Sequence, residues 1–455
     1  MDSPERVFTA EVEASAPPTL ARNEGSTRLD IPLGTEAALA CFVYERPLDA
    51  AGALLAVAKA VGAGPGVTVR RMAPTEVAVV AGAPALFLRV DYETTTPGGT
   101  AAGQMKLMVS ASPGLPLLCA HDEPGYAKTF RRITTDLARS LQVPGRVRPS
   151  ASGEELHVLK LDGKLAGFEW RASRSVGGGH TRTESTTSLL LPGADGGLRA
   201  EDSTTTTLTD ERGHLTELRH ARAEDGALAL QVTLRRERAP VASTTPGARP
   251  PARDGGSTEP SAGATSAARD APSTGPATRV APEGPSAPRT APSATPAPRT
   301  ASGTEPASHT APGTTPSVEP APSASREPTR PEDLTVPGTA YRYEGRQGTR
   351  ALKGTFTSKR GVATEDDLRL TLSKWLLSGD RAEVVLDVYR PAVDTTAPVE
   401  LTLRRESSAG PRALTLTMGA STAKARANAQ GLLEWLELSR PEGTLTSELI
   451  HTAAP

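Results

Sequence analysis

The sequence is poor in the residues that usually build and staple a protein core. Aromatic side chains make up 3% of its 455 residues, and there are only two cysteines, Cys41 and Cys119. Two cysteines form at most one bridge, which excludes a framework of several disulfides. Because large aromatic side chains are scarce, we expect the cores to be built mainly from Val, Leu and Ala.

The chain also lacks an excess of charge of either sign. Lysine and arginine number 51 and aspartate and glutamate 52, so the formal net charge is −1. A balanced chain has no overall basic field to attract nucleic acid or an anionic membrane surface. We therefore expect no nucleic-acid partner.

Long apolar runs are missing as well. No run approaches the ~18 residues that a transmembrane helix needs, and the start, MDSPERVFTAEVEAS, has no basic stretch followed by an apolar one. The sequence predicts no transmembrane segment and a cytoplasmic location, with export to the periplasm as the alternative if the start site is misassigned. Cys41 and Cys119 would stay reduced in the first compartment and could pair in the second.

One segment, residues 240–332, has a composition unlike the rest. It is built almost wholly from Pro, Ala, Thr, Ser, Gly and Arg, and from Ala271 it repeats in tens, as in APSTGPATRV, APEGPSAPRT and APSATPAPRT. Such a segment cannot bury enough apolar surface to offset the entropy of ordering, so it is predicted to be disordered. We interpret it as a spacer; the alternatives are a ligand for a proline-binding groove and a glycosylated stalk.

Residues 1–145 combine strand and helix patterns. Strand-like runs are predicted at 6–12, 38–44, 67–71, 76–80, 86–93, 104–110 and 115–120. An Ala-rich helix is expected over 50–61, ending at Gly62. A second helix is expected to have Asp122 as its N-cap and to bury one apolar stripe, Phe130, Ile133, Leu137 and Leu141. The pattern predicts an antiparallel sheet with flanking helices.

Three segments of this block share a recognisable order: VVAGAPALFLRVDYE (79–93), QMKLMVSAS (104–112) and YAKTFRRITTDLARSL (126–141). Strand, Gly-x-Pro turn, strand, amphiphilic strand and long terminal helix follow one another. Residues 5–143 resemble the PsbP-like fold on this basis. The resemblance implies an antiparallel sheet between helices and a non-catalytic accessory or adaptor role.

Residues 151–238 read as a β-meander. The strand-like runs are 156–161, 168–173, 182–191, 198–208, 215–221 and 227–237. Asp162-Gly163 and Asp225-Gly226 stand between such runs and predict tight hairpins, because this pair favours the turns that match the twist of two strands. The Thr-rich run 198–208 fits a sheet face that contacts water.

Strand patterns resume in residues 336–455. Runs at 341–345 and 352–359 precede a helix over 365–378, in which Thr364 and Asp367 form a capping box and Gly379 is the expected terminator. Further strands are predicted at 383–389, 399–405, 413–418, 422–428, 432–438 and 444–450. Because 151–238 has no helix to cover its apolar face, we predict that both pieces form one β domain with the tract as an insertion. Two separate β domains are the alternative.

The ending GLLEWLELSRPEG (431–443) follows a strand-rich first half, a short helix and a second set of strands. In this order the two pieces resemble β-clam domains of bacterial envelope proteins and of proteins with transglutaminase-like domains. The predicted fold class of the whole chain is therefore α+β, with a mostly antiparallel β domain after the N-terminal sheet.

The densest group of chemically active residues is Cys119 and His121, followed by Asp122 and Glu123. On a strand, Cys119 and His121 share one face. They could act as a thiolate and its base, or as half of a metal site completed by Cys41. The simpler interpretation, which we favour, is a buried strand end with a small apolar cysteine. A disulfide between Cys41 and Cys119 is a further alternative.

Trp170, Trp375 and Trp435 are the only tryptophans. We interpret them as core anchors, with a cleft for an apolar ligand as the alternative. His214 and His220 are an even number of residues apart on one polar strand, where we expect them to face solvent.

No motif predicts a catalytic, cofactor or metal site. The leading hypothesis is a non-enzymatic bacterial scaffold, adaptor or accessory protein whose partner is an unknown protein or a small apolar ligand. The rivals are a carrier of an apolar ligand in the β domain and a thiol enzyme around Cys119 and His121.

Overall fold

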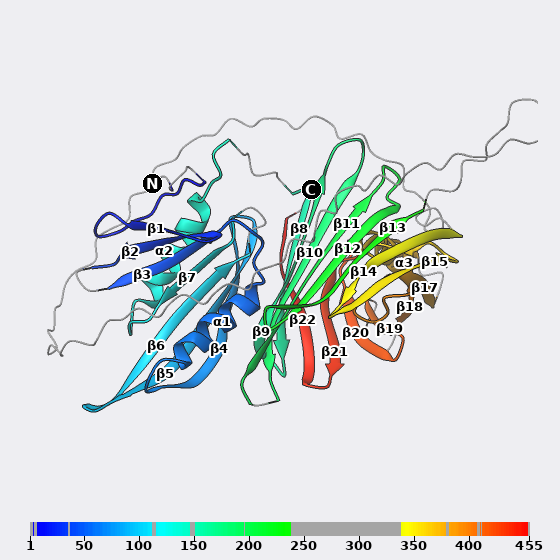
Figure 1. Cartoon of the computed structure of the whole chain (residues 1–455). Helices are drawn as coiled ribbons and strands as arrows, with labels where there is room; N and C mark the ends of the chain where they lie inside the picture. The colour runs from blue at the N-terminus through cyan, green and yellow to red at the C-terminus, as the bar shows by residue number, and fades with distance from the viewer. Residues whose placement is uncertain are drawn as a thin grey trace, which may run out of the picture.

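The computed structural model describes residues 3, 7–34, 37–111, 115–145, 151–194, 196–237, 338–378, 382–406, 410 and 412–453. In this part of the chain the fold is mostly β, with two sheets and three helices (Figure 1). The tract predicted at 240–332 and the helix terminator Gly379 lie outside the described residues. None of the described helices is long and apolar enough to cross a membrane.

The N-terminal unit is a seven-stranded antiparallel sheet with a helix on each face. Helix α1 (Ala50–Gly62) packs on one face and α2 (Ala127–Ser140) on the other. The strands, in the order β1-β2-β3-β7-β6-β5-β4, are β1 (Thr19–Asn23), β2 (Ser26–Pro32), β3 (Ala38–Tyr44), β4 (Val67–Val80), β5 (Ala83–Thr96), β6 (Gly99–Ser110) and β7 (Leu117–His121).

Three sequence predictions for this unit were wrong. Of the strand predicted at 6–12, the described residues 7–12 form no strand and make only an isolated bridge between Thr9 and Gln142. The strands expected at 67–71 and 76–80 are one strand, β4, whose pairing with β5 shifts register on either side of Pro74. Asp122 does not cap α2, because the chain first turns through Gly125 and the helix starts after Tyr126, whose φ is 54°. The β1–β2 hairpin was not predicted.

The remaining strands form one fifteen-stranded sheet that curls into a near-closed, barrel-like domain (Figure 1). Its order is β15-β14-β13-β12-β11-β10-β9-β8-β22-β21-β20-β19-β18-β17-β16. From the first piece come β8 (Gly153–Leu161), β9 (Lys164–Ser175), β10 (Thr181–Pro192), β11 (Leu198–Thr209), β12 (Leu215–Glu224) and β13 (Ala227–Arg236). From the second come β14 (Thr339–Gln347), β15 (Arg350–Ser358), β16 (Val362–Ala363), β17 (Glu383–Val388), β18 (Val399–Arg405), β19 (Ala413–Met418), β20 (Ser421–Ala427), β21 (Leu433–Arg440) and β22 (Gly443–Ala453).

The two pieces of this domain are joined at two places. Strand β13, which precedes the tract, pairs directly with β14, which follows it. The last strand, β22, pairs with the first, β8. Strands from both 151–237 and 338–453 thus belong to one continuous sheet in the described chain.

The two edges of the sheet approach each other where the barrel nearly closes. The edge strands β15 and β16 are consecutive in the chain. Near them the Ser358 hydroxyl donates to the Asp387 carboxylate at 2.9 Å, and the backbone N–H of Val362 donates to the Tyr341 hydroxyl at 3.4 Å. Polar contacts therefore replace a regular strand pair at this seam.

Two predicted Asp-Gly turns and the predicted capping box of this domain are confirmed. Asp162-Gly163 and Asp225-Gly226 connect paired strands with positive φ at both residues, the geometry for which Asp-Gly is suited. Helix α3 (Glu365–Ser378) begins with the capping box: the Asp367 backbone N–H donates to the Thr364 hydroxyl at 3.1 Å, and the Thr364 backbone N–H donates to the Asp367 carboxylate at 2.7 Å.

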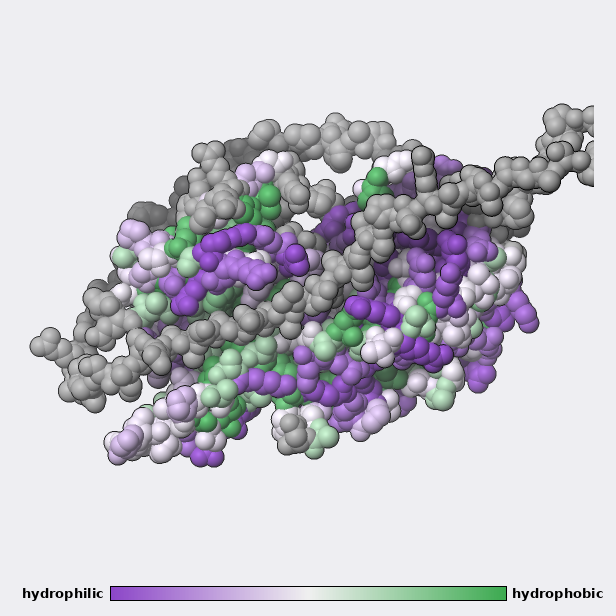
Figure 2. Space-filling view, viewed as in Figure 1, coloured by the Kyte–Doolittle hydropathy of each residue, from purple (hydrophilic) through white to green (hydrophobic). Residues whose placement is uncertain are grey.

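Helix α1 joins the N-terminal unit to the barrel-like domain. One side of α1 covers its own sheet, and the other packs on the outer face of the second sheet, so that a single apolar cluster contains residues of both. The barrel-like domain contributes Leu156, Phe168, Trp170, Ala172, Leu190 and Ala200 to this cluster. Apolar residues at the exterior are scattered, and hydrophilic residues cover much of the barrel-like domain in Figure 2.

Candidate functional site

The inner face of β9–β12 carries a regular array of polar side chains. On β10 the inward residues are Thr183, Ser185 and Thr187, and on β11 they are Ser203, Thr205 and Thr207. They recur at every second position because alternate residues of a strand share a face. The register places them directly opposite one another as three cross-strand hydroxyl pairs: Thr183 with Thr207, Ser185 with Thr205, and Thr187 with Ser203.

The neighbouring strands extend this hydroxyl array on both sides. Glu169 of β9 stands opposite Thr187, and Arg171 stands opposite Ser185. On the other side His220 of β12 stands opposite Thr205. The array therefore passes from an acid, across hydroxyl groups, to an imidazole.

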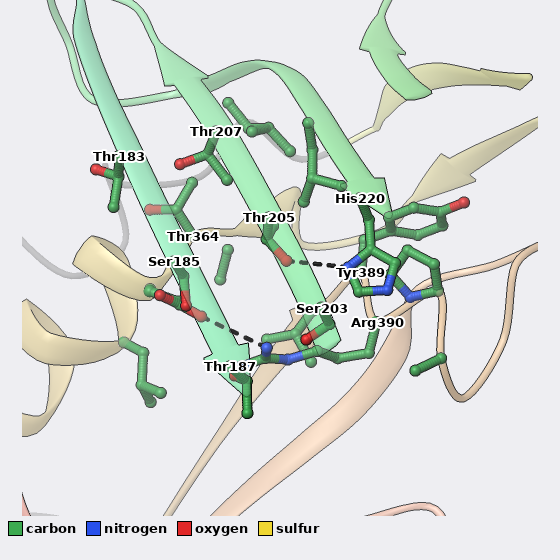
Figure 3. Close-up of a pocket in the computed structure, with 18 of the residues that line it drawn as sticks. Thr183, Ser185, Thr187, Ser203, Thr205, Thr207, His220, Thr364, Tyr389 and Arg390 are labelled. Atoms are coloured by element: carbon green, nitrogen blue, oxygen red, sulfur yellow. Dashed lines mark hydrogen bonds and ion pairs between the residues drawn. The ribbon is translucent and has the colours of Figure 1, made fainter. Parts of the chain in front are cut away.

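The array forms one wall of a cavity of about 190 Å³. The facing wall comes from the start of α3, with Thr364, and from the segment that follows β17, whose Arg390 side chain extends toward the hydroxyl groups in Figure 3. The Tyr389 ring also lines the cavity, but its hydroxyl points away and donates to the Thr395 carbonyl at 2.8 Å. The volume of the cavity is below the ~300–1,000 Å³ of a drug-sized pocket, so the cavity suits a small molecule.

Several hydroxyl groups of the array have unused hydrogen-bonding capacity. Thr183 donates to Asp366 at 3.1 Å, and Thr205 bonds the His220 Nδ1 atom at 3.0 Å. Ser185, Thr187, Ser203 and Thr207 make no side-chain hydrogen bond within the described residues. Each of these hydroxyls can donate one hydrogen bond and accept others, so a polar guest would find partners along both strands.

Glu169 is the acidic residue of the cavity wall. Its side chain is only half-buried by surface area because it borders the cavity, but protein atoms surround it. Burial raises the pKa of Glu169 to about 7, with a further upward contribution from Glu365 and an opposing one from Arg390. Near neutral pH the carboxyl group is therefore poised between its neutral and charged forms.

His220 is 8% exposed and lies at the opposite side of the array. Its Nε2 atom has no hydrogen-bond partner within the described residues. Burial lowers the pKa of His220 to about 4, and the positive charges of Arg390 and Arg222 act in the same direction. The imidazole is consequently neutral at physiological pH, and its buried Nε2 atom is the ring nitrogen left without a partner in the described chain. Our expectation that His220 faces solvent was wrong, because its strand turns this face into the barrel.

An ion cluster beside Glu169 connects β8 and β9 to α3. The buried guanidinium of Arg171 lies 3.5 Å from Glu155 and 3.4 Å from Glu365, and it also bonds Asp366. These bonds fix the start of α3 against β8 and β9. They hold one wall of the cavity against the other.

The sequence-predicted site around Cys119 is a structural centre. Cys41 and Cys119 stand opposite each other on β3 and β7 and are joined by a disulfide beneath α2. Neither sulfur is a thiolate in this structure, so the thiol and metal chemistry considered for Cys119 lacks its reactive group.

His121 lies two residues from this disulfide and is 2% exposed. Its Nδ1 atom is 3.4 Å from the Lys106 ammonium group, and its ring contacts Tyr126 and Phe130. Burial, together with the charge of Lys106, lowers the pKa of His121 to about 4. His121 is therefore a neutral packing residue within the N-terminal unit.

The three tryptophans are not brought together, and none lines the cavity. Trp170 is buried on the outer face beneath α1. Trp375 of α3 is buried against β18–β20 and lies under the Arg405 guanidinium, 4.9 Å from its ring centre. Trp435 is half-buried on β21.

Sequence reasoning missed the residues that form the cavity. Glu169 was included in a strand without a role, and Arg390 and Tyr389 were not singled out. The sequence feature that could have indicated the cavity wall is the alternation of hydroxyl residues in 183–187 and 203–207. This alternation gives each of two consecutive strands one polar face. Alternation alone does not tell which face points inward.

Known proteins similar to this chain are few and distant. No protein-family model matches the chain, and no curated protein matches it. Among solved structures, it is similar to a beta-barrel-like protein of a domain of unknown function, DUF1849, from Brucella abortus, with 9% identity and a TM-score of 0.35 over 67% of this chain and 98% of that chain. A structure from Bacteroides thetaiotaomicron is 12% identical, with a TM-score of 0.20 over 34% of this chain and 51% of that chain. Scores at this level assign the chain to no family.

Proposed function

We propose that the protein is a non-enzymatic accessory protein that binds a small polar molecule inside its barrel-like domain. The observation that carries this proposal is the cavity wall of three cross-strand hydroxyl pairs between Glu169 and His220. Ligand sites in proteins are concave and contain a few converging polar groups that orient the guest. Unused hydroxyl groups on an inner face supply such partners.

Leu215, Leu218 and Leu368 also line the cavity, but its hydroxyl and carboxyl groups favour a guest with polar groups over the wholly apolar ligand considered from the sequence. An apolar molecule would bury hydroxyl groups and a carboxyl group without replacing their hydrogen bonds to water, which costs free energy for each group. A polar molecule offers replacement bonds. The tryptophans that suggested an apolar cleft pack elsewhere.

The accessory role is the part of the proposal that concerns the N-terminal unit. The PsbP-like resemblance of residues 5–143 and the joining of Cys119 to Cys41 both favour a binding role over a thiol enzyme. The same disulfide favours an oxidising compartment such as the periplasm, because structural disulfides persist there and are rare in the cytoplasm.

The test is a binding screen on the full chain with two panels, one of small polyols, sugars and amino acids and one of fatty acids. Binding is measured as ligand-dependent stabilisation and confirmed by native mass spectrometry. We expect stabilisation by members of the polar panel. Stabilisation by fatty acids alone would overturn the proposal and restore the apolar carrier.

A pair of variants locates the binding site. Thr187→Val removes an inward hydroxyl at nearly constant volume, and Thr204→Val removes an exposed hydroxyl on the outer face of the same sheet. The first is expected to weaken binding of the polar ligand and the second to leave it unchanged. Equal effects of the two variants would place the ligand elsewhere.

A further inference from the structure

The carboxylates around the cavity outnumber the guanidinium groups that pair with them, and Glu169 is the carboxylate left without an ion pair in the described chain. Arg369 pairs with Glu155 at 3.0 Å, and Arg390 pairs with Glu365 at 3.5 Å. Arg171 forms ion pairs with Glu155, Glu365 and Asp366, so each of these three carboxylates has a guanidinium partner. Glu169 has no hydrogen bond or ion pair within the described residues.

A carboxylate enclosed by protein without a partner is unfavourable, and a guest of positive charge would relieve it. The surroundings suit such a guest. Thr187 stands directly across the strand pair from Glu169, and Ser203 follows it on β11. Hydroxyl oxygens accept hydrogen bonds, so an ammonium group that contacts Glu169 has further acceptors for its remaining N–H bonds.

His220 is an independent observation that points to a ligand. It is more than nine-tenths buried, it lines the cavity, and its Nε2 atom lacks a partner in the described chain. Whichever ring nitrogen carries the proton, a neutral imidazole offers a hydrogen bond to a polar group of the guest. Glu169 on β9 and His220 on β12 lie on opposite sides of the hydroxyl array, so a guest directed toward both needs two polar ends.

We propose that the cavity binds a small organic molecule with a primary ammonium group at one end, held by Glu169, and a hydroxyl or similar polar group at the other, directed toward His220. This inference rests on the function proposed above and specifies the chemistry of its ligand. An organic cation is favoured over a metal ion because no three His, Cys, Asp or Glu side chains of the described residues are arranged to hold a metal.

The test uses three probes of nearly equal size that differ at one end only: ethanolamine, ethylene glycol and glycolate. Each is titrated into the full chain, and binding is followed by ligand-observed NMR and calorimetry at neutral to mildly basic pH. We expect ethanolamine to bind most tightly and glycolate most weakly. Glu169→Gln is expected to lower the affinity for ethanolamine by about tenfold or more, the loss typical of a charge-assisted hydrogen bond.

Two variants accompany Glu169→Gln. Glu169→Asp keeps the charge on a shorter side chain and should retain part of the preference for ethanolamine, which keeps the test valid if the glutamine variant folds poorly. Glu344→Gln is the matched control, because Glu344 is an exposed glutamate on β14 outside the cavity. It should bind ethanolamine as the parent chain does.

The outcomes separate the two proposals. Equal binding of ethanolamine and ethylene glycol, or an unchanged affinity in Glu169→Gln, would overturn the ammonium inference and leave a polar binding site. Failure of the parent chain to bind any of the three probes at millimolar concentration would overturn the ammonium inference, while the panel of polyols, sugars and amino acids decides separately whether the proposed function holds. Preference for ethanolamine that depends on Glu169 supports both.

Discussion

The carboxylate of Asp202 on β11 accepts a hydrogen bond from the backbone N–H of Gly52, 2.8 Å away in the first turn of α1. Its other oxygen accepts from the Ala51 N–H at 3.0 Å and from the Ser188 hydroxyl at 2.7 Å. Asp49, at the N-cap position of α1, makes no side-chain capping bond. Helix α1 of the N-terminal unit is thus capped by Asp202 of the barrel-like domain. A negative charge at this position also interacts favourably with the positive end of the helix dipole.

We expect Asp202→Ala to destabilise the protein by about 1–2 kcal/mol, the usual cost of losing a capping side chain and its buried bonds. Asp49→Ala is the matched control and should cost less, because the Asp49 side chain makes no capping hydrogen bond to α1. Urea unfolding followed by circular dichroism measures both. A larger loss for Asp49→Ala would contradict the assignment of the cap to Asp202.

Removing the Cys41–Cys119 bridge should also lower stability. The bridge links residues 78 apart, and the chain-entropy model gives about 4 kcal/mol for a loop of that length. The double variant Cys41→Ala, Cys119→Ala should therefore unfold at a lower urea concentration than the parent. Two reactive thiols in the native, unreduced parent protein would argue against the bridge, and labelling with and without reductant measures this.

Replacing residues 238–337 by a short Gly/Ser linker should preserve the fold and raise its stability. The flanking residues are already close, since the Glu237 backbone N–H donates to the Ala340 carbonyl at 2.9 Å across β13 and β14. Shortening a loop about tenfold lowers its closure cost by about 2 kcal/mol if the tract behaves as a flexible chain. Loss of cooperative unfolding in the shortened chain would show that the tract is needed for the sheet.

The affinity for ethanolamine should rise as pH increases through about 7 and then level off. The pKa of Glu169 is raised to about 7, mainly by burial, so the carboxyl group is protonated below that pH and cannot pair with an ammonium ion. The charged groups that face it are Glu155 on β8, Arg171 on β9, Glu365 in α3 and Arg390 after β17. His220, with its pKa near 4, stays neutral over this range. Calorimetry at several pH values measures the profile.

Glu169→Gln provides the control for this pH dependence. Its affinity for ethanolamine should be low and nearly constant between mildly acidic and mildly basic pH, because glutamine does not titrate. A profile of the parent shape in this variant would assign the titration to another group of the cluster.

Much of the barrel-like domain could be predicted from the sequence because its signals are local. Asp162-Gly163 and Asp225-Gly226 encode their turns through the backbone conformations that the two residues tolerate. The α3 start at Thr364 is encoded by a capping box whose members are three residues apart. Where the signal was weaker, as at Asp122, a plausible capping residue was chosen and the helix began after Tyr126.

The candidate site could not be predicted in the same way. Its members come from β9, β10, β11, β12, α3 and the segment after β17, and they meet only when the sheet curls. In the sequence Glu169 is only one polar residue of a predicted strand. The strand register of the folded sheet is what places it opposite Thr187. His220 was assigned to solvent because strand periodicity distinguishes two faces without identifying the inner one.

The sequence by itself determined two Asp-Gly turns, the approximate positions of most strands of the β domain, the capping box of α3 and the separate composition of residues 240–332, because each depends on neighbours along the chain. Tertiary structure decided the rest. It placed Cys41 opposite Cys119, brought Asp202 to the start of α1, and turned a face of threonine and serine hydroxyls into a cavity between Glu169 and His220. These relationships depend on which strands pair and which way the sheet curls, and both are set by burial over the whole domain.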